Sequence, residues 1–375
     1  GTDSRLYYFN DSKASINQRP SPTWTSQALG GWIEKGTLDM SDDGDYVVVG
    51  GTGQSLYYFA GCRGRSGSSE NPTWSQVFGS FDFFAVHISS DGGYVAAGGA
   101  NSPSGGFVIF YANANAILGP SPSPNWTATS SINGTIKDLA VSDDGYTVAA
   151  IDYVNLYYWA NATSLSGDPN ATWTAEEEGG DFFSLDISFD GDEVACGMGL
   201  PMPCGLHFWT GARVRSGPDQ AEDWVRFEGS VVWDVVVSND GEIIAASVEN
   251  NSSYKALFFK SDGIMIGEFD LLQFSPLVSM SGDGGITVVA GPGPFSLHMF
   301  KALEDLTPPL ITDVYQDPNS VNPDDEVMVY ANVTDGESKV KNVFIKYTNE
   351  TGTWITNMTN FEGNKWNGTI PEWNS

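Results

Sequence analysis

The sequence has few basic residues. Of its 375 residues, 17 are lysine or arginine and 47 are aspartate or glutamate, which gives a formal net charge of −30. A surface this acidic repels nucleic acid and anionic membranes, so neither is expected as a partner. No run of about 18 apolar residues occurs, and the sequence therefore predicts no membrane span.

Cysteine is also scarce, with Cys62, Cys196 and Cys204 the three that occur. The absence of any Cys-x-x-Cys spacing excludes a thiolate zinc site. Cys196 ends one expected strand and Cys204 precedes the next. A hairpin would bring such positions within disulfide reach, so we expect this pair to be joined in an oxidising compartment. Cys62 is then left free or pairs with another chain.

The three histidines, His87, His207 and His298, fall in three different repeats and suggest no catalytic triad. His207 and His298 occupy a strand position that usually holds tyrosine or phenylalanine, which favours a packing role. Phosphate-binding loops, His-Glu-x-x-His and haem motifs are absent. The sequence therefore favours a protein that is not an enzyme and has no organic cofactor.

Turn-forming and aromatic residues are abundant: glycine occurs 43 times and aromatics make up 13% of the chain, a composition that favours β-structure. Sequons for N-linked glycosylation are dense, and their number indicates a secreted, glycosylated, extracellular protein. The eleven sequons begin at Asn10, Asn125, Asn133, Asn161, Asn170, Asn250, Asn251, Asn332, Asn349, Asn357 and Asn367.

A short motif, Ser-x-Asp-Gly between two apolar segments, recurs six times at intervals of 43 to 53 residues. A fixed period in this range is typical of repeat architectures. Aspartate side chains bind nearby backbone N–H groups and glycine adopts positive φ, so we interpret the motif as a tight turn between strands. The copies begin at Ser41, Ser89, Ser142, Ser188, Ser238 and Ser281.

Two more strand signals accompany each turn, one resembling Leu-Tyr-Tyr-Phe and one centred on tryptophan. Four antiparallel strands in about 50 residues predict a blade of a β-propeller. We expect six blades, with the strand around Trp24 pairing with the last blade (residues 277 to 300) to close the ring. Because the Leu-Tyr-Tyr-Phe signal occurs seven times, seven blades is the alternative, one of them completed from outside this chain or by another subunit.

The repeat resembles the extracellular WD40-like and YVTN-like propellers of archaeal and bacterial surface proteins. The resemblance rests on Ser-x-Asp-Gly-x-x-Val-Ala-Ala-Gly, as in the segment from Ser89 to Gly98. It implies an all-β fold with a propeller over residues 1 to 303, followed by a linker over 304 to 309.

Residues 310 to 375 resemble an immunoglobulin-like or fibronectin-III-like β-sandwich, with Val333-Thr334-Asp335 among the matching pieces. Such a sandwich needs about seven strands, and only about five fit here. We therefore expect this domain to be incomplete, either because the natural chain is longer or because a neighbouring subunit adds a strand.

Three groups of residues are candidates for binding. Polar residues of the innermost strands could hold a divalent cation in the central channel: Asp39, His87, Asp138, Asp186 and Asp234. A calcium ion could bind in the C-terminal domain at Asp324, Asp325 and Asp335. Basic loop residues on the rim of the Ser-x-Asp-Gly turns could dock onto the acidic surface of another subunit: Arg19, Arg63, Arg65, Arg213 and Arg215.

The function expected from these features is that of a structural subunit in a cell-surface layer or an extracellular filament, with copies of itself as partners. A monomeric adhesin that binds cell-surface carbohydrate is one alternative. A propeller hydrolase or lyase is another, and the missing catalytic constellation disfavours it.

Overall fold

In the computed structural model the chain divides into two compact units, Gly1–Ala302 and Leu303–Ser375. The described residues are 1–375 without 1–3, 11–20, 32, 34–35, 52, 102–104, 178–179, 200–203, 251–252, 272–276, 292–296, 302–309, 318–325, 335–342, 350–351 and 371–375. The predicted linker, residues 304 to 309, lies outside them. No helix among the described residues is long and apolar enough to cross a membrane.

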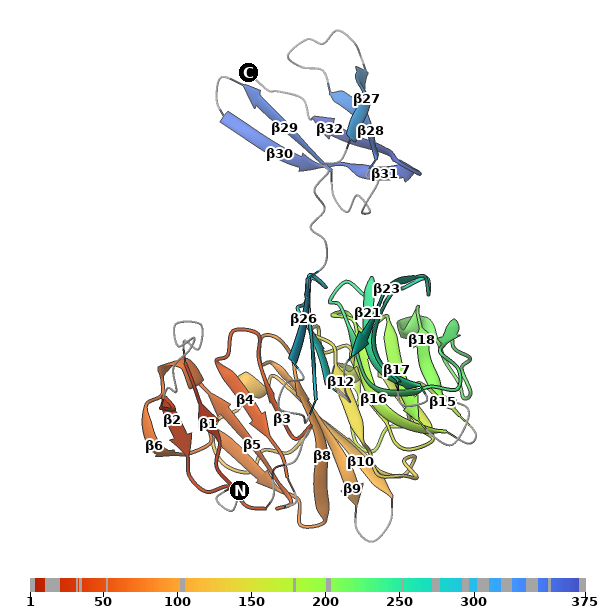
Figure 1. Cartoon of the computed structure of the whole chain (residues 1–375). Helices are drawn as coiled ribbons and strands as arrows, with labels where there is room; N and C mark the ends of the chain where they lie inside the picture. Colours follow the sequence, from red (N-terminus) through yellow and green to blue (C-terminus); the bar gives the residue numbers. More distant parts are fainter. Residues whose placement is uncertain are drawn as a thin grey trace. The chain divides into compact units, whose positions relative to one another are not determined.

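The first unit consists of β-sheets that follow one another along the chain, and their described strand pairs are antiparallel except that of β2 with β6 (Figure 1). Within its described residues, five sheets have four strands each, and spatial order follows sequence order. The first is β3 (Leu38–Met40), β4 (Tyr46–Val49), β5 (Ser55–Ala60) and β7 (Trp74–Val77). The second is β8 (Phe81–Ile88), β9 (Tyr94–Asn101), β10 (Gly106–Ala112) and β11 (Trp126–Ala128). The third is β12 (Asp138–Val141), β13 (Thr147–Ile151), β14 (Asn155–Ala160) and β15 (Trp173–Glu176). The fourth is β16 (Asp181–Ile187), β17 (Val194–Gly199), β18 (Gly205–Trp209) and β19 (Trp224–Arg226), and the fifth is β20 (Val231–Val237), β21 (Ile243–Asn250), β22 (Ser253–Lys260) and β23 (Met265–Leu271).

Two further sheets of this unit have three described strands each. One is β24 (Leu277–Met280), β25 (Ile286–Ala290) and β26 (Leu297–Lys301), and the other is β1 (Tyr7–Tyr8), β2 (Trp24–Ser26) and β6 (Gly67–Glu70). The predicted closure of a six-bladed ring by the Trp24 strand is wrong for this structure, because β2 pairs with β1 and β6 and not with β26. The Trp24 indole donates a hydrogen bond to the Cys62 carbonyl, just after β5 of the following sheet, and this bond holds β2 beside that sheet.

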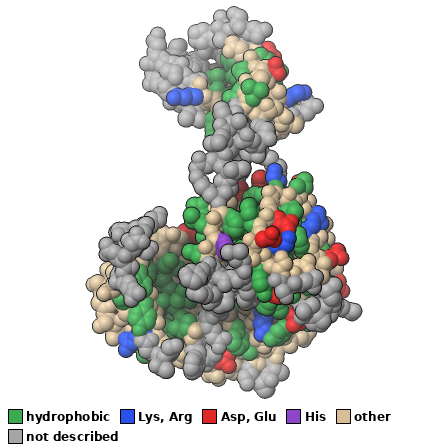
Figure 2. Space-filling view, viewed as in Figure 1, with side chains coloured by type: hydrophobic (Ala, Val, Ile, Leu, Met, Phe, Trp, Pro, Cys, Tyr) green, Lys and Arg blue, Asp and Glu red, His purple; other side chains and the backbone are tan. Residues whose placement is uncertain are grey.

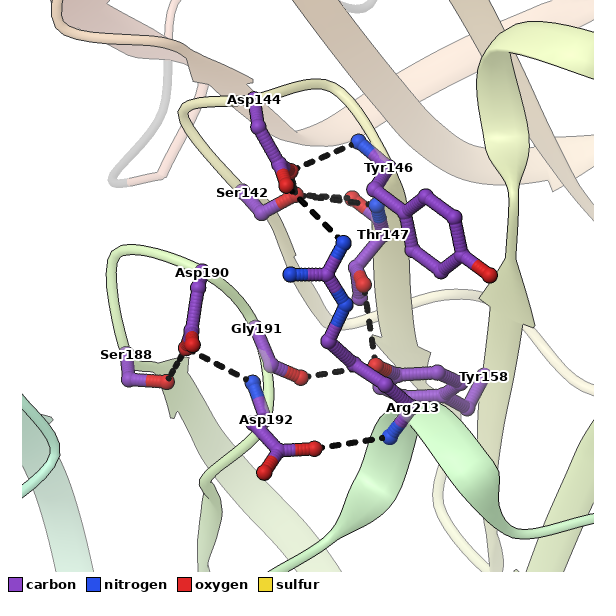
Figure 3. Close-up of polar contacts among 10 residues, drawn as sticks. All are labelled: Ser142, Asp144, Tyr146, Thr147, Tyr158, Ser188, Asp190, Gly191, Asp192 and Arg213. Atoms are coloured by element: carbon purple, nitrogen blue, oxygen red, sulfur yellow. Dashed lines mark hydrogen bonds and ion pairs between the residues drawn. The ribbon is translucent and has the colours of Figure 1, made fainter.

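Each Ser-x-Asp-Gly motif forms the turn between the first two strands of a sheet, as predicted (Figure 3). In the third sheet the Ser142 hydroxyl donates to Asp144 Oδ1 at 2.7 Å and accepts the Thr147 N–H at 2.9 Å. Asp144 Oδ1 also accepts the Tyr146 N–H at 2.9 Å. Gly145 has φ +65°, a left-handed conformation that favours glycine. The aspartate is therefore part of the turn.

Tryptophan side chains tie five of the sheets to the next one along the chain. The Trp173 indole stacks on Tyr158 and donates from Nε1 to the Ala212 carbonyl at 2.8 Å. Ala212 begins η5 (Ala212–Val214), one of four described one-turn 3-10 helices, with η2 (Cys62–Gly64), η3 (Ala114–Ala116) and η4 (Ala162–Ser164). The same bond recurs between Trp24 and Cys62, Trp74 and Ala114, Trp126 and Ala162, and Trp224 and Ser261.

Tyrosine hydroxyls make a second bond across several of these junctions. Tyr158 donates to the Gly191 carbonyl at 2.7 Å, and Tyr8 and Tyr58 donate to the matching glycines, Gly44 and Gly92. The apolar cores lie between consecutive sheets: one combines Val148 and Trp159 with residues of the sheet before. Packing from sheet to sheet is therefore the main stabilisation of this unit.

The second unit contains a four-stranded sheet and a hairpin. The sheet has the order β27 (Leu310–Asp317), β28 (Val327–Thr334), β32 (Lys365–Ile370) and β31 (Thr359–Glu362), and the hairpin is β29 (Phe344–Asn349) with β30 (Gly352–Asn357). Its small core contains Ala331, Val333, Met358 and Trp366.

The indole bond between sheets predicts a specific loss of stability. Trp173→Phe keeps an aromatic ring on Tyr158 but removes the indole donor to the Ala212 carbonyl, which then keeps the Arg215 N–H at 3.3 Å as its donor. The loss of one such hydrogen bond costs about 0.5–1.5 kcal/mol. We expect a decrease of that size in the free energy of unfolding of the first unit, measured by urea denaturation. Trp366→Phe is the matched control, because the Trp366 Nε1 atom has no hydrogen-bond partner among the described residues. An equal effect of both substitutions on that transition would contradict the role assigned to the bond.

Candidate functional site

The first strands of six sheets, β3, β8, β12, β16, β20 and β24, line one central cavity of about 250 Å³. The middle residues of the Ser-x-Asp-Gly turns form a chain of contacts around its mouth. Asp143 N–H donates to the Phe189 carbonyl, Phe189 N–H to the Asn239 carbonyl, and Asn239 N–H to the Gly282 carbonyl, at 2.7–2.9 Å. On the other side, the Ser90 N–H donates to the Asp143 carboxylate.

The polar residues that the sequence placed on the innermost strands accept hydrogen bonds from the next strand of the ring. Asp39 accepts the Ile88 N–H at 2.9 Å and Asp186 accepts the Val237 N–H at 2.7 Å. Asp138, Asp234 and His87 do the same with Leu185, Val278 and Val141. Among the described residues these carboxylates do not converge as a group of cation ligands. Joining neighbouring blades is therefore the role that the geometry gives them.

Burial shifts the pKa of two of these acids. It raises the pKa of Asp186 from its usual 3.8 to about 6, and the hydrogen bond from Val237 opposes part of that rise. It also raises the pKa of Asp143, which the bonds from Ser90 partly offset. The cavity therefore holds acids that are harder to ionise than carboxyl groups in water.

The sheet β1–β2 holds the position of a blade that precedes β3–β7. It contacts that sheet through the same tryptophan and tyrosine bonds that join complete blades. In a complete blade the matching strand, β5, lies between β4 and β7, whereas β1 has a described neighbour on one side only. The two inner strands of this blade are thus missing from the described part of the chain.

Apolar side chains are exposed on the side of β3 that faces this incomplete position. Leu38 and Met40 are 45% and 48% exposed, whereas the matching Val86 and Ile88 of the next sheet are 6% and 4% exposed. The difference arises because Val86 and Ile88 pack against the preceding complete sheet. Leu38 and Met40 are left without that cover.

The last sheet of the ring shows the complementary exposure. Leu297 and Met299 on β26 are each 73% exposed, whereas the matching Leu56 and Tyr58 on β5 are fully buried against the following sheet. Figure 2 shows hydrophobic side chains gathered in the hollow between the first and last sheets. We call the position bounded by β1, β3 and β26 the open blade position. The seventh Leu-Tyr-Tyr-Phe signal pointed to such a position, whereas the exposed residues on β3 and β26 follow the same sequence pattern as their buried counterparts.

The predicted disulfide between Cys196 and Cys204 is wrong for this structure, since both cysteines are buried and no disulfide joins them. In the β17–β18 ladder Cys196 lies opposite His207, three residues from Cys204. An offset of three residues is about 10 Å along a strand and places the two side chains on opposite faces. A disulfide needs Cα atoms closer than about 7 Å.

The long loops predicted to form a docking rim contact the preceding blade. Glycines in three of them lie beside the tryptophan strand of that blade: Gly67 beside Trp24, Gly167 beside Trp126 and Gly217 beside Trp173. Arg213 extends from such a loop to Asp144 Oδ2 at 2.9 Å and lies over the Tyr146 ring (Figure 3). It thus joins two blades of the same chain.

The other predicted docking arginines differ in exposure and in the hydrogen bonds that they form within the chain. Arg65 and Arg215 donate to backbone carbonyls of their own loops and are mostly buried. Arg63 is exposed, so its role in docking stays a prediction. Arg19 lies outside the described residues, as do the proposed calcium ligands Asp324, Asp325 and Asp335.

Most of the sequon asparagines that the structure describes are on the surface. Asn10, Asn125, Asn133, Asn161, Asn170, Asn250 and Asn357 are exposed. Asn332 and Asn367 are half-buried in the second unit, and Asn251 lies outside the described residues. Their glycosylation stays a prediction.

The raised pKa of Asp186 predicts a pH-dependent stability. Between pH 3.8 and about 6 the folded chain binds more protons than the unfolded chain, so ionisation of Asp186 lowers stability as the pH rises through this window. Asp186→Asn keeps an oxygen for the Val237 N–H and does not titrate. We expect equal stabilities near pH 3.5 and a variant that is more stable at pH 7.5, by about 3 kcal/mol at most at about 1.4 kcal/mol per pKa unit.

Chemical denaturation across this pH range measures the effect. Glu228→Gln, which removes one charge from an exposed position, is the control and should leave the difference near zero. A difference between Asp186→Asn and the parent that does not change with pH would contradict the assignment.

Comparison with known proteins bears on the fold. No protein-family model and no curated protein matches the sequence. Among solved structures 1266 chains match, including the crystal structure of the β-propeller domain of Cps50 (Swd1) from Myceliophteria thermophila. That match has a TM-score of 0.52 at 10% identity and covers 73% of this chain and 83% of that one. At so low an identity the likeness concerns the fold alone, and with the sheets described above it identifies a WD40-like β-propeller.

Proposed function

We propose that this protein is a non-enzymatic structural subunit of an extracellular cell-surface assembly, a surface layer or a filament, built from copies of itself. The observation that carries the proposal is the open blade position, where apolar side chains on β3 and β26 are uncovered. The four junctions between the five four-stranded sheets bury the matching side chains. Uncovered apolar faces of this kind favour association.

In this proposal the ring has seven blade positions. Five are the four-stranded sheets, the sixth is β24–β26, and the seventh is the incomplete blade of β1 and β2, whose missing inner strands leave the open blade position. The sixth also lacks an outer strand among the described residues. Strands supplied by another subunit would complete both, which is strand addition to a free sheet edge.

The strand we propose as the donor is β27 of a neighbouring copy. It lies at an edge of its own sheet, and Leu310, Ile311, Val314 and Tyr315 are all more than half exposed. A long, exposed, apolar edge strand is a ready partner for another edge. Pairing β27 with β26 would cover Leu297 and Met299 and extend the sheet across copies.

Charge also favours this mode of contact. At a net charge of −30, two copies repel each other over most of their surfaces. An apolar contact with paired backbone groups overcomes that repulsion better than a polar face would. We further propose that the second unit is the immunoglobulin-like module expected from the sequence, which presents β27 as a donor.

The proposal of a structural role is supported by the use of the cavity acids as blade-to-blade acceptors. The extracellular location is supported by the exposed sequon asparagines.

The proposal predicts that a charge on β26 prevents assembly. Met299→Asp places a carboxylate on the exposed apolar face, and we expect the variant to stay monomeric under conditions where the parent chain forms ordered polymers. Light scattering and negative-stain imaging measure the difference. Leu118→Asp, at an 87% exposed position in the loop that follows η3, is the matched control and should assemble normally.

A cross-linking experiment tests the donor strand. Cysteines in place of Met299 and Ile311 should give a disulfide between copies when the two variants are mixed, and none when either is oxidised alone at low concentration. A parent chain that stays monomeric at all concentrations would overturn the proposed function. Assembly without cross-linking would retain it and exclude β27 as the donor.

A further inference from the structure

A buried histidine in the fourth sheet has no hydrogen-bond partner. His207 on β18 is 2% exposed, and neither its Nδ1 nor its Nε2 atom is bonded to any described residue. Buried polar atoms are nearly always paired, so an imidazole with both nitrogens unsatisfied indicates a missing ligand.

Its tyrosine counterparts in two other blades are satisfied. Tyr157 occupies the same place in the third sheet, and its hydroxyl donates to Asp152 Oδ2 at 2.9 Å. Tyr57 in the first sheet accepts the Gly30 N–H at 3.0 Å. These two tyrosines each have a polar partner, whereas His207 has none on either ring nitrogen among the described residues. His298, which occupies the same position in the sixth sheet, likewise has no partner at Nε2 among them.

Two carboxylates lie beside the imidazole. Nδ1 of His207 is 3.6 Å from Glu177 Oε1 and 3.8 Å from Glu222 Oε1, and the three ligand atoms all lie within 4.8 Å of one another. Glu177 follows β15 of the third sheet, and Glu222 precedes β19 of the fourth. Neither carboxylate forms an ion pair with lysine or arginine in the described part of the chain.

From this geometry we propose that Glu177, His207 and Glu222 form a binding site for a divalent transition-metal ion, Zn²⁺ above all, that joins the third and fourth blades. Zn²⁺ binds imidazole nitrogen and carboxylate oxygen at about 2.0–2.2 Å, so its ligand atoms lie about 3.3 Å apart. The observed separations need only small side-chain rotations to reach that value. A water molecule completes four-coordination on the exposed side of the carboxylates.

The choice of metal follows from the donors. Ca²⁺ and Mg²⁺ prefer oxygen ligands throughout, and imidazole is a poor ligand for both. The site has no thiolate among its three ligands, which disfavours Cu⁺. One imidazole and two carboxylates suit Zn²⁺ and its neighbours Co²⁺ and Ni²⁺.

The electrostatics of the site agree with a bound cation. Burial lowers the pKa of His207 to about 4, so the ring is neutral and its lone pair is available near neutral pH. Burial, together with the neighbouring Glu222, raises the pKa of Glu177 to about 7. Two half-buried carboxylates with no cation between them repel each other, and a divalent ion removes that repulsion.

Isothermal titration of the full chain, freed of metal with EDTA, tests the site. We expect one saturable Zn²⁺ site per chain and a Tm that rises with Zn²⁺, because binding to the folded state stabilises it. Ca²⁺ and Mg²⁺ should produce neither effect at the same concentrations. His207→Tyr introduces the residue that Tyr157 represents in the third sheet, so it should fold, and it should weaken Zn²⁺ binding by about tenfold or more.

Variants that each remove one negative charge distinguish direct Zn²⁺ ligation from a general attraction of Zn²⁺ to an acidic surface. Glu177→Gln and Glu222→Gln should each weaken Zn²⁺ binding, whereas Glu176→Gln, which alters an exposed residue next to the site, should not. Circular dichroism confirms that each variant is folded. The absence of saturable Zn²⁺ binding, equal binding by folded His207→Tyr, or Ca²⁺ binding as tight as that of Zn²⁺ would overturn the proposal.

Discussion

The hydrogen bond from a tryptophan indole to a carbonyl in the next blade determines much of the ring. It recurs at five junctions with N–O distances of 2.8–3.1 Å. The indole ring stacks on an aromatic residue of its own sheet, and its N–H reaches a carbonyl just after the third strand of the next sheet. The bond therefore fixes both the spacing and the rotation of neighbouring blades. Because donor and acceptor are largely buried at the junction, water cannot readily replace the bond while the blades stay packed.

Many of the excess acidic side chains accept hydrogen bonds from backbone N–H groups. In each Ser-x-Asp-Gly turn the aspartate accepts a local N–H, and in the cavity aspartates accept N–H groups of the next inner strand. A chain with 17 basic residues has too few cations to pair with 47 acids. Backbone N–H groups pair with these acids instead, so the inner strands of neighbouring blades are joined by hydrogen bonds that do not depend on lysine or arginine. Where burial dominates, as at Asp186, the acid becomes harder to ionise.

The sequence predicted what depends on local spacing. The Ser142 turn and the tryptophan strands follow from interactions within about ten residues, and these predictions are confirmed. Predictions about long-range contacts were less reliable. The Cys196–Cys204 disulfide failed on the register of one ladder, and closure by the Trp24 strand failed because its indole belongs to the following sheet.

The site around His207 shows the same limit. Its ligands come from two blades, and Glu177 and Glu222 are 30 and 15 residues from the histidine in sequence, so no compact motif marks them. A signal was nonetheless present: His207 replaces the tyrosine that the repeat places there in two other blades. A polar residue that replaces another polar residue at a repeat position loses the hydrogen-bond partner found there in the other repeats, and a buried one then needs a different partner.

A repeat protein makes most of its contacts between neighbouring repeats, so its terminal repeats expose the surfaces that the others bury. In an open stack these ends need polar caps. In a ring the two ends face one another, and here both carry apolar residues at the positions that pack elsewhere, Met40 at one end and Met299 at the other. Neither end has the polar substitutions expected of a cap. The open blade position is thus better explained as a surface that another chain segment covers than as the finished edge of a solitary propeller.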